Sequence, residues 1–365
     1  MQGFECACGQ PLFFDSFVCE RCGRPVGFAP DRQRMVTLET EPRDAADLAV
    51  LHDRDGRYRF CRNGEEHAVC NWLIPTGQAD DLCQACQLNR TVPDLGQPAN
   101  LRRWGRLEAA KRRLVYTLLA MRLPVASRLK VPEWGLAFDF LEDRRSNPAM
   151  PVDFVATGHA DGVITINLLE ADPVEQVRAR ERLHEQYRTL LGHMRHESGH
   201  YYWDLLVRDG PALDGFRERF GDERTDYRAA LDRHYQQGAP ADWSERFISA
   251  YASAHPWEDW AETWAHYLHM TDSLETARAF GVVDDGEKRA PEAFDVRVER
   301  WAGLMVTLNE LNRSMGQDDP YPFVITPTVV DKLRFVHETL EHAVADPRIA
   351  SDGLSTAGVA DHQRG

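Results

Sequence analysis

The stretch "RHESGHYYWD", Arg195 to Asp204, decides the fold, because it places two histidines and a glutamate on an otherwise amphipathic helix. His196 and His200 are four residues apart, so on a helix they stand about 40° apart around the axis and about 6 Å apart along it. Both imidazoles can therefore reach one metal ion. Glu197 projects about 100° away from His196, beside a water on that ion rather than in the ligand plane. This H-E-x-x-H spacing predicts a zinc site at which Glu197 acts as general base.

A zinc site of this kind needs a third protein ligand. The continuation typical of metzincins is excluded, because Trp203 and Leu206 occupy its glycine and histidine positions. In "HPWEDWAETWAHYLHM", residues 255–270, Glu258 and Glu262 are four residues apart and so share one face of a second helix. One carboxylate can bind zinc, and the other can accept the free N–H of a ligand histidine and fix its tautomer.

The eight cysteines form two groups of four within the first 86 residues. The groups are Cys6, Cys8, Cys19 and Cys22, then Cys61, Cys70, Cys83 and Cys86. Gly9 and Gly23 directly follow cysteines, where a tight turn lets backbone amides point at thiolate sulfur. The spacing predicts two closed structural zinc sites, because zinc supplies folding free energy that so small a core lacks. The alternative is a pair of disulfides in a secreted domain, which the absence of a signal sequence disfavours.

Composition narrows the class of protein. The chain has 365 residues, 43% of them hydrophobic, and a formal net charge of −15, which argues against nucleic acid or anionic lipid as the main partner. No run of about 18 apolar residues occurs, so we expect a cytoplasmic protein without a membrane span. The stretch 101–130 differs from the acidic remainder of the chain, because it contains nine basic residues and the single acid Glu108. We interpret it as a solvated helix face that pairs with acidic neighbours, with a nucleic-acid patch as the alternative.

Turn-forming residues and periodicity divide the chain. "TVPDLGQPAN", residues 91–100, has the composition of a linker. We therefore expect a zinc-ribbon domain at 1–95, a second domain at 100–348 and a flexible tail at 349–365. Helical periodicity predicts helices at 101–130, 173–207, 217–234, 257–270, 294–312 and 328–344. "GVITINLLEAD", residues 162–172, is β-branched and predicts a strand.

Four stretches carry a specific resemblance: "CNWLIP", "LCQACQLNRTVPDL", "RTLLGHMRHESGHYYWDLL" and "ISAYASAHPWEDWAETWAHYL". Over nearly its whole length the chain resembles bacterial zinc-binding metallopeptidases that carry an N-terminal zinc-ribbon domain. The resemblance implies an α+β fold, with a two-site zinc ribbon followed by a mainly helical, zincin-like metallopeptidase domain that has a small sheet.

A more distant similarity to the lethal-factor type of toxin peptidase, a gluzincin, assigns roles to the second helix. It implies that Glu258 is the third zinc ligand and that Glu262 hydrogen-bonds a ligand histidine. Those enzymes also place a tyrosine seven residues before the ligand glutamate. Here that residue is Tyr251, which the resemblance nominates as a donor to the oxyanion, with an ordinary core aromatic as the alternative.

Other candidates have plainer interpretations. His193, His255, His266 and His269 are more typical of packed or solvated histidines, and His255 is the best placed of them to face substrate. Tyr201 and Tyr202 are interpreted as packing residues. The strand at 162–168 is either the edge strand that pairs with an extended substrate or an ordinary member of the sheet.

The leading hypothesis is a zinc-dependent hydrolase of peptide or other amide bonds, with one catalytic and two structural zinc ions. One alternative is a zinc-ribbon adaptor that binds protein or nucleic acid and carries a non-catalytic third zinc. Another is an amidase that acts on a non-protein amide. Glu197 favours an enzyme, because a structural site has no use for it and prefers cysteine ligands. A protein partner for the zinc-ribbon domain stays open under each hypothesis.

Overall fold

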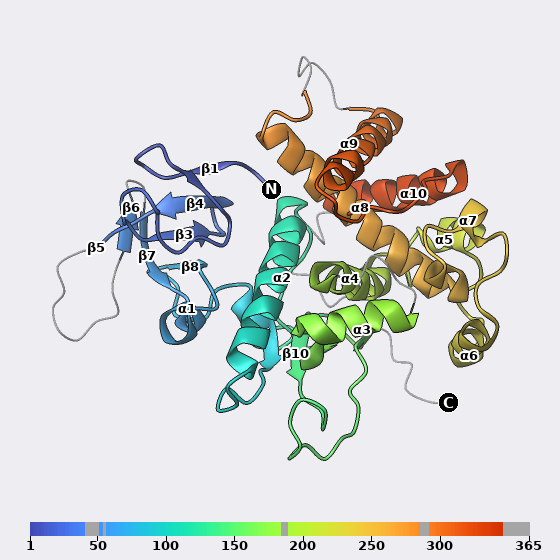
Figure 1. The fold of residues 1–365 in the computed structure, drawn as a ribbon, viewed down its shortest axis with the longest axis horizontal. Coiled ribbons are helices and arrows are strands. Elements are labelled where there is room, and N and C mark those ends of the chain that lie inside the picture. Colours follow the sequence, from blue (N-terminus) through green and yellow to red (C-terminus); the bar gives the residue numbers. More distant parts are fainter. Residues whose placement is uncertain (41–50, 54–55, 184–188, 285–291, 346–365) are drawn as a thin grey trace.

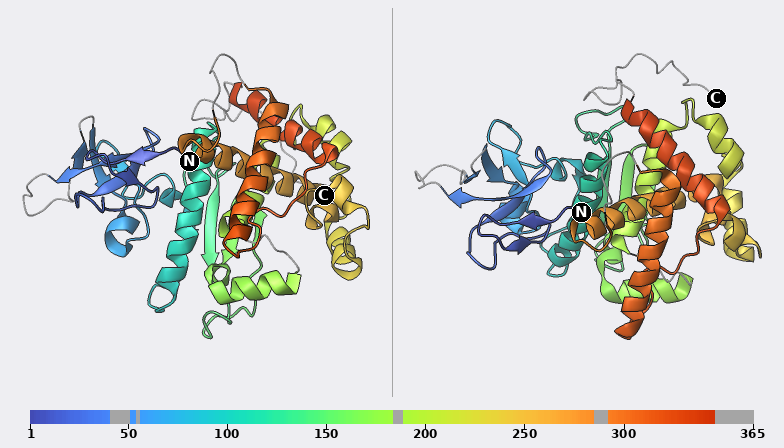
Figure 2. Two further views of the ribbon diagram at one scale, coloured as in Figure 1. Left: turned by 45° about the horizontal axis from the view of Figure 1, so that its top comes forward. Right: turned by 90° about the horizontal axis from the view of Figure 1, so that it is seen from above.

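The computed structural model describes residues 1–40, 51–53, 56–183, 189–284 and 292–345. Figure 1 shows a β-rich lobe, drawn in blue, and a helical lobe, with the long helix α2 (Asn100–Ala120) between them. The two further views in Figure 2 keep the same arrangement. The α+β class predicted from sequence is confirmed, with short strands at the N-terminal end and mainly helices after it.

The β-rich lobe consists of short antiparallel strands. Strand β1 (Phe4–Glu5) pairs with β2 (Pro11–Leu12), and β3 (Val26–Ala29) pairs with β4 (Arg34–Thr37). A further sheet has the order β5 (Glu39–Thr40), β6 (Leu51–Asp53), β7 (Gly56–Phe60) and β8 (Leu73–Pro75), and α1 (Arg62–His67) follows β7. Strands this short bury little apolar surface by themselves, which is why metal ligands are expected to stabilise such a lobe.

A second four-stranded sheet belongs to the helical lobe. Its order is β11 (Gly158–Ala160), β12 (Val163–Asn167), β10 (Ala137–Leu141) and β9 (Asn89–Thr91). Strands β9, β10 and β12 are parallel, whereas β11 is antiparallel, and β11 and β9 form the two edges. The interpretation of residues 162–168 as the edge strand is therefore wrong, and the alternative of an ordinary sheet member holds.

The remaining helices are α3 (Pro173–Leu183), α4 (Leu190–Leu206), α5 (Leu213–Phe220), α6 (Tyr227–Gln237), α7 (Trp243–Arg246), α8 (Pro256–Ala279), α9 (Phe294–Ser314) and α10 (Pro327–Ala345). The predicted helices at 257–270, 294–312 and 328–344 lie inside α8, α9 and α10. A single helix over 173–207 is wrong, because Thr189 caps a new helix by accepting the Gly192 N–H at 2.9 Å. The predicted helix at 217–234 is also divided, since Gly221 ends α5 with a φ of 103°.

Helix α2 joins the two lobes through a shared core. Tyr116 packs against Phe14 and Phe28 of the β-rich lobe, with ring centroids 5.4 and 5.7 Å apart. On its other side the Tyr116 hydroxyl donates to Glu275 of α8 at 3.0 Å. Buried apolar residues of both lobes therefore form one continuous cluster. The predicted domain boundary at 95–100 remains a prediction.

The basic stretch ends its helix at Ala120 rather than near residue 130. Several of its charges pair with acids, as predicted: Arg103 with Asp172 at 2.8 Å, Arg113 with Asp15 at 2.6 Å and Lys130 with Asp80 at 2.7 Å. Lys111 and Arg112 are buried rather than solvated, contrary to the prediction. Arg112 donates to the Val69 carbonyl of the β-rich lobe, whereas Lys111 donates to Glu108 of α2 and to Asn89 of β9.

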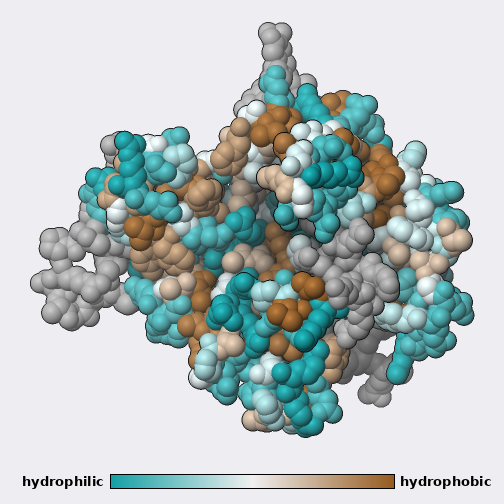
Figure 3. Space-filling view, viewed as in Figure 1, coloured by the Kyte–Doolittle hydropathy of each residue, from teal (hydrophilic) through white to brown (hydrophobic). Residues whose placement is uncertain are grey.

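Within the described ranges, no helix combines the length and apolarity needed to cross a bilayer. Figure 3 shows apolar residues as scattered patches on a largely hydrophilic face, which fits the strongly acidic composition.

Candidate metal centre

A close crossing of α4 and α8 builds the candidate site (Figure 1). A Cβ atom added to Gly199 would lie 2.9 Å from the Ala261 Cα, so only glycine allows this approach. Two indoles of α8 reinforce the crossing, because Trp260 donates to the Gly199 carbonyl at 2.9 Å and Trp264 to the Ser198 hydroxyl at 3.0 Å. The crossing brings the first turns of α8 against the two histidines of α4.

Three side chains converge where these helices meet. The Glu258 Oε2 atom lies 3.0 Å from the His196 Nε2 atom and 3.6 Å from the His200 Nε2 atom. The three atoms that could bind a metal all lie within 4.8 Å of one another. Two imidazoles and one carboxylate are a donor set that zinc uses at catalytic sites.

The other ring nitrogen of His196 fixes which of its atoms can bind a metal. Its Nδ1 atom lies 2.7 Å from the Glu262 Oε1 atom, and the Ser249 hydroxyl donates to the second oxygen of Glu262 at 2.6 Å. With the proton on Nδ1, the Nε2 lone pair faces the buried Glu258 Oε2 atom, which has no hydrogen-bond partner. Two acceptors at this distance repel unless a proton or a metal cation lies between them, and the donor set fits a metal ion.

Electrostatics support the same interpretation. Burial alone would lower the pKa of His196, but Glu258 and Glu262 raise it well above its ordinary value. Burial would raise the pKa of Glu258, yet His196 and His200 hold it well below its usual range. The Glu258 carboxylate is therefore ionised while almost fully buried, at 1% exposure of its side chain. A buried carboxylate of this kind needs positive charge beside it.

Two contacts at this site had not been predicted. The Tyr227 hydroxyl of α6 donates to the Glu258 Oε1 atom at 2.5 Å, from 31 residues earlier in the chain. Ser249, the partner of Glu262, is the second. Neither residue belongs to a motif with fixed spacing, so only the folded chain reveals them.

Glu197 and Tyr251 are the two remaining candidates for catalysis. Glu197 directly follows His196 on α4 and is 9% exposed. Tyr251 begins the 3-10 turn Tyr251–Ala254, and its ring centroid lies 5.9 Å from that of His196. Burial and the Glu258 carboxylate raise the pKa of Tyr251 well above its ordinary value, so the phenol keeps its proton and can donate it to a hydrogen bond.

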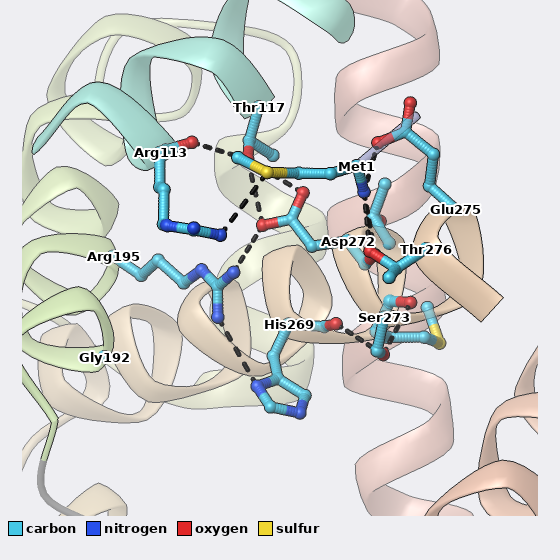
Figure 4. A network of polar contacts seen from close by, with 12 residues as sticks. Met1, Arg113, Thr117, Gly192, Arg195, His269, Asp272, Ser273, Glu275 and Thr276 are labelled. Atoms are coloured by element: carbon cyan, nitrogen blue, oxygen red, sulfur yellow. Dashed lines mark hydrogen bonds and ion pairs between the residues drawn. The ribbon is translucent and has the colours of Figure 1, made fainter. Parts of the chain in front are cut away.

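The remaining histidines have partners outside the convergent atoms. His193 Nδ1 lies 3.0 Å from Glu170, and His266 Nδ1 lies 2.7 Å from the Tyr321 hydroxyl. His269 Nδ1 lies 3.4 Å from Arg195, which also pairs with Asp272 (Figure 4). These three histidines are therefore packed against neighbouring side chains, as predicted, and are not directed at the metal position.

His255, the best placed of the four histidines to face substrate, is packed, which is the interpretation preferred for all four. His255 is 3% exposed, and both of its ring nitrogens are engaged. Its Nδ1 atom accepts the Trp257 N–H at 3.1 Å, and its Nε2 atom lies 3.0 Å from the Thr225 carbonyl oxygen. His255 therefore caps α8 and ties it to the segment before α6. Tyr201 and Tyr202 pack as predicted, with their hydroxyls bound to the carbonyls of Trp134 and Pro124.

The eight cysteines gather as two separate groups of four, each with its sulfur atoms within 4.8 Å of one another. Sulfur separations of 3.6 Å for Cys6 and Cys22, and of 3.6 Å for Cys70 and Cys83, far exceed a disulfide bond of about 2.05 Å. The disulfide alternative is therefore wrong, because all eight thiols are free.

The turns at the first cysteine group have the predicted backbone geometry, but the thiols differ in pKa. Gly9 and Gly23 have φ values of 81° and 71°, as the predicted tight turns require. Their own N–H groups bind the carbonyls of Cys6 and Cys19 rather than sulfur. Burial would raise the pKa of Cys6, but hydrogen bonds from the Cys8 N–H and the Thr37 hydroxyl lower it to about 6. The Arg24 N–H lowers the pKa of Cys22, yet burial and the neighbouring thiols raise it to about 11.

Comparison with known proteins places the chain in a family. Residues 100–339, more than half of the chain, match the model of a family described as "Putative zinc-binding metallo-peptidase", and residues 3–97 match a zinc-ribbon domain. An uncharacterized protein of Mycobacterium bovis is 40% identical over 353 residues, which cover 95% of this chain and 97% of the relative. Uncharacterized proteins of two strains of Mycobacterium tuberculosis show the same identity and coverage. No solved structure matches the chain significantly.

The resemblance to zinc-binding metallopeptidases with an N-terminal zinc-ribbon domain is thus confirmed along both parts of the chain. The chain belongs to this family of zinc-binding metallopeptidases and carries the zinc-ribbon domain at its N-terminal end.

Proposed function

We propose that the chain is a zinc-dependent hydrolase of peptide bonds whose catalytic zinc is held by His196, His200 and Glu258. The observation that carries the proposal is the convergence of two Nε2 atoms on the buried Glu258 Oε2 atom, which has no hydrogen-bond donor. The two cysteine groups hold structural zinc ions in this proposal, so the complete protein contains three.

Each neighbouring side chain has a separate task. Zinc, when bound, acts as a Lewis acid and lowers the pKa of a coordinated water to about 7. Glu197 takes a proton from the attacking water and passes it to the leaving amine. Tyr251 donates a hydrogen bond to the substrate oxygen that gains negative charge. Glu262 keeps the Nδ1 proton on His196, which leaves the Nε2 atom free as a ligand.

A peptide is the proposed substrate because an edge strand lies beside the metal ligands. His159 of β11 stacks on His200, with ring centroids 6.4 Å apart and planes 8° apart. Strand β11 is an edge of its sheet and pairs with β12 on one side. An extended peptide can add to such an edge through main-chain hydrogen bonds. Because β11 lies next to His200, a peptide bound along β11 would have an amide bond close to the reacting groups.

The test is hydrolysis of a peptide library by the purified full chain, with and without a chelator. We expect cleavage that stops on mild chelation and returns with added zinc. Glu197→Gln should keep the zinc content of the wild type and lower the rate by about 10²–10⁴-fold, as loss of a general base does. Glu218→Gln, at a side chain 77% exposed, is the matched control and should leave the rate unchanged. Full activity of Glu197→Gln would refute the assignment of the base.

A further inference from the structure

The two oxygens of the Glu258 carboxylate have different surroundings. Oε2 faces the Nε2 atoms of His196 and His200, at 3.0 and 3.6 Å. Oε1 accepts a hydrogen bond from the Tyr227 hydroxyl at 2.5 Å. One oxygen is thus directed at the candidate metal position while the other is bound by a neighbouring helix.

The Tyr227 side chain is itself held firmly. It is the first residue of α6, whose N-terminus is capped by Asp226, which accepts the Ala229 N–H at 3.0 Å. Its ring packs edge-on against His255, with centroids 5.1 Å apart, and is tilted against Trp257 at 5.8 Å.

The same histidine fixes α6 relative to α8. His255 caps α8 through Trp257 and also lies 3.0 Å from the carbonyl of Thr225, just before α6. The phenol of Tyr227 and the carboxylate of Glu258 therefore sit on elements that are tied together next to the contact. A fixed donor of this kind can orient a carboxylate rather than follow it.

We propose that Tyr227 is a positioning residue that makes Glu258 offer a single oxygen to the metal. This inference rests on the proposed function. A hydrogen bond that occupies Oε1 disfavours binding of zinc by both carboxylate oxygens. A zinc ion held through Oε2 alone would keep a position for water and substrate, which a catalytic site needs and a closed structural site lacks. Partners that hold a ligand in this way typically change metal affinity by about 10–100-fold when they are lost.

The experiment compares Tyr227→Phe with a matched variant, Tyr267→Phe. Tyr267 lies on α8 like Glu258, is buried, and its hydroxyl lies 2.8 Å from His337 Nδ1, away from the site. Each variant therefore loses a phenol hydroxyl that links two helices, and Tyr267 also loses a longer contact from Arg297 at 3.5 Å. The zinc affinity of the chelator-labile ion is measured by competition with a chelator on the full chain, together with total zinc content and thermal unfolding.

We expect Tyr227→Phe to weaken binding of the labile zinc by about 10–100-fold, to keep the two ribbon ions and to melt like Tyr267→Phe. Tyr267→Phe should bind all three ions as the wild type does. Equal zinc affinity in Tyr227→Phe and the wild type would overturn the inference alone. A wild-type chain that takes up only two zinc ions would instead overturn the proposed function.

A second variant can test the positioning role of Tyr227 if Tyr227→Phe does not fold. Asp226→Ala removes the cap of α6 and keeps the phenol, so it should loosen Tyr227 and weaken labile zinc in the same direction by a smaller factor. Unchanged zinc affinity in a folded Asp226→Ala chain would then count against the positioning role.

Discussion

At the scale of single residues, the candidate site depends on how each polar atom is used. His196 has one ring nitrogen directed at Glu262 and the other at Glu258, so no tautomer satisfies both carboxylates without an added cation or proton. Glu258 in turn divides its two oxygens between Tyr227 and the histidines. The two Nε2 lone pairs and the Oε2 atom have no part in these hydrogen bonds, and a zinc ion would be their common partner.

Removing the carboxylate ligand should separate the labile zinc from the ribbon zinc. We expect Glu258→Ala to lose the chelator-labile ion and to keep the two ions of the cysteine groups. Glu258 belongs only to the site that it forms with His196 and His200. Zinc content after mild chelation measures this. Glu341→Ala, at a side chain 68% exposed, is the control. A fully loaded labile site in Glu258→Ala would show that the third ligand lies elsewhere.

Sequence could predict the residues of this site that repeat every four positions on a helix. His196 and His200 share one face of α4, and Glu258 and Glu262 share one face of α8, as helical geometry requires. Tyr227 and Ser249 could not be predicted, because their partners are set by packing between helices and not by spacing along the chain. The partners of His255 could not be predicted for the same reason, since they depend on how α6 meets α8.

At the scale of helices and strands, the crossing of α4 and α8 determines whether the ligands meet. Gly199→Ala would force a Cβ atom to 2.9 Å from the Ala261 backbone, which side-chain rotation cannot relieve. We expect a loss of about 1–3 kcal/mol in the free energy of unfolding and weaker labile zinc, because the helices must move apart. Denaturant unfolding and zinc titration measure both.

A second glycine provides the matched control for that crossing. Gly303 lies inside α9, where an added Cβ atom meets nothing within 4 Å. Gly303→Ala should therefore stabilise the chain by about 0.4–1 kcal/mol, through reduced freedom of the unfolded state. If both variants gained stability, close contact at Gly199 would not limit the crossing.

Element boundaries were less predictable than element types. The apolar spacing that predicts a helix continues through residues 173–207. Spacing carries no information about the Thr189 hydroxyl, which caps a new helix. Gly221 in the sequence indicates a helix end, but the helix at 217–234 was predicted from apolar periodicity alone. The edge position of β11 depends on the pairing order of strands, which short strands of this kind do not specify by sequence.

At the scale of the whole molecule, the zinc ribbon and the helical lobe share structure through α2. Arg112 is buried, donates to the Val69 carbonyl of the ribbon and pairs with Asp15 at 3.3 Å. On the opposite side of α2, the Thr117 hydroxyl donates to Asp272 of α8 at 2.8 Å, and Asp272 also binds Arg195 of α4 (Figure 4). Helix α2 thus connects polar contacts of the ribbon with those of Arg195, the residue that precedes His196.

The second cysteine group should consequently stabilise both lobes. Its four cysteines are all buried, and the Cys86 sulfur lies 3.8 Å from Glu108 of α2, whereas Cys22 of the first group is exposed. We expect Cys83→Ser to lower the melting temperature of the helices by several degrees more than Cys22→Ser, at about 2–4 °C for each kcal/mol lost. Circular dichroism at helical wavelengths measures this, because most helices lie in the second lobe. Helices that melt at the wild-type temperature in Cys83→Ser would show that the lobes fold independently despite their shared core.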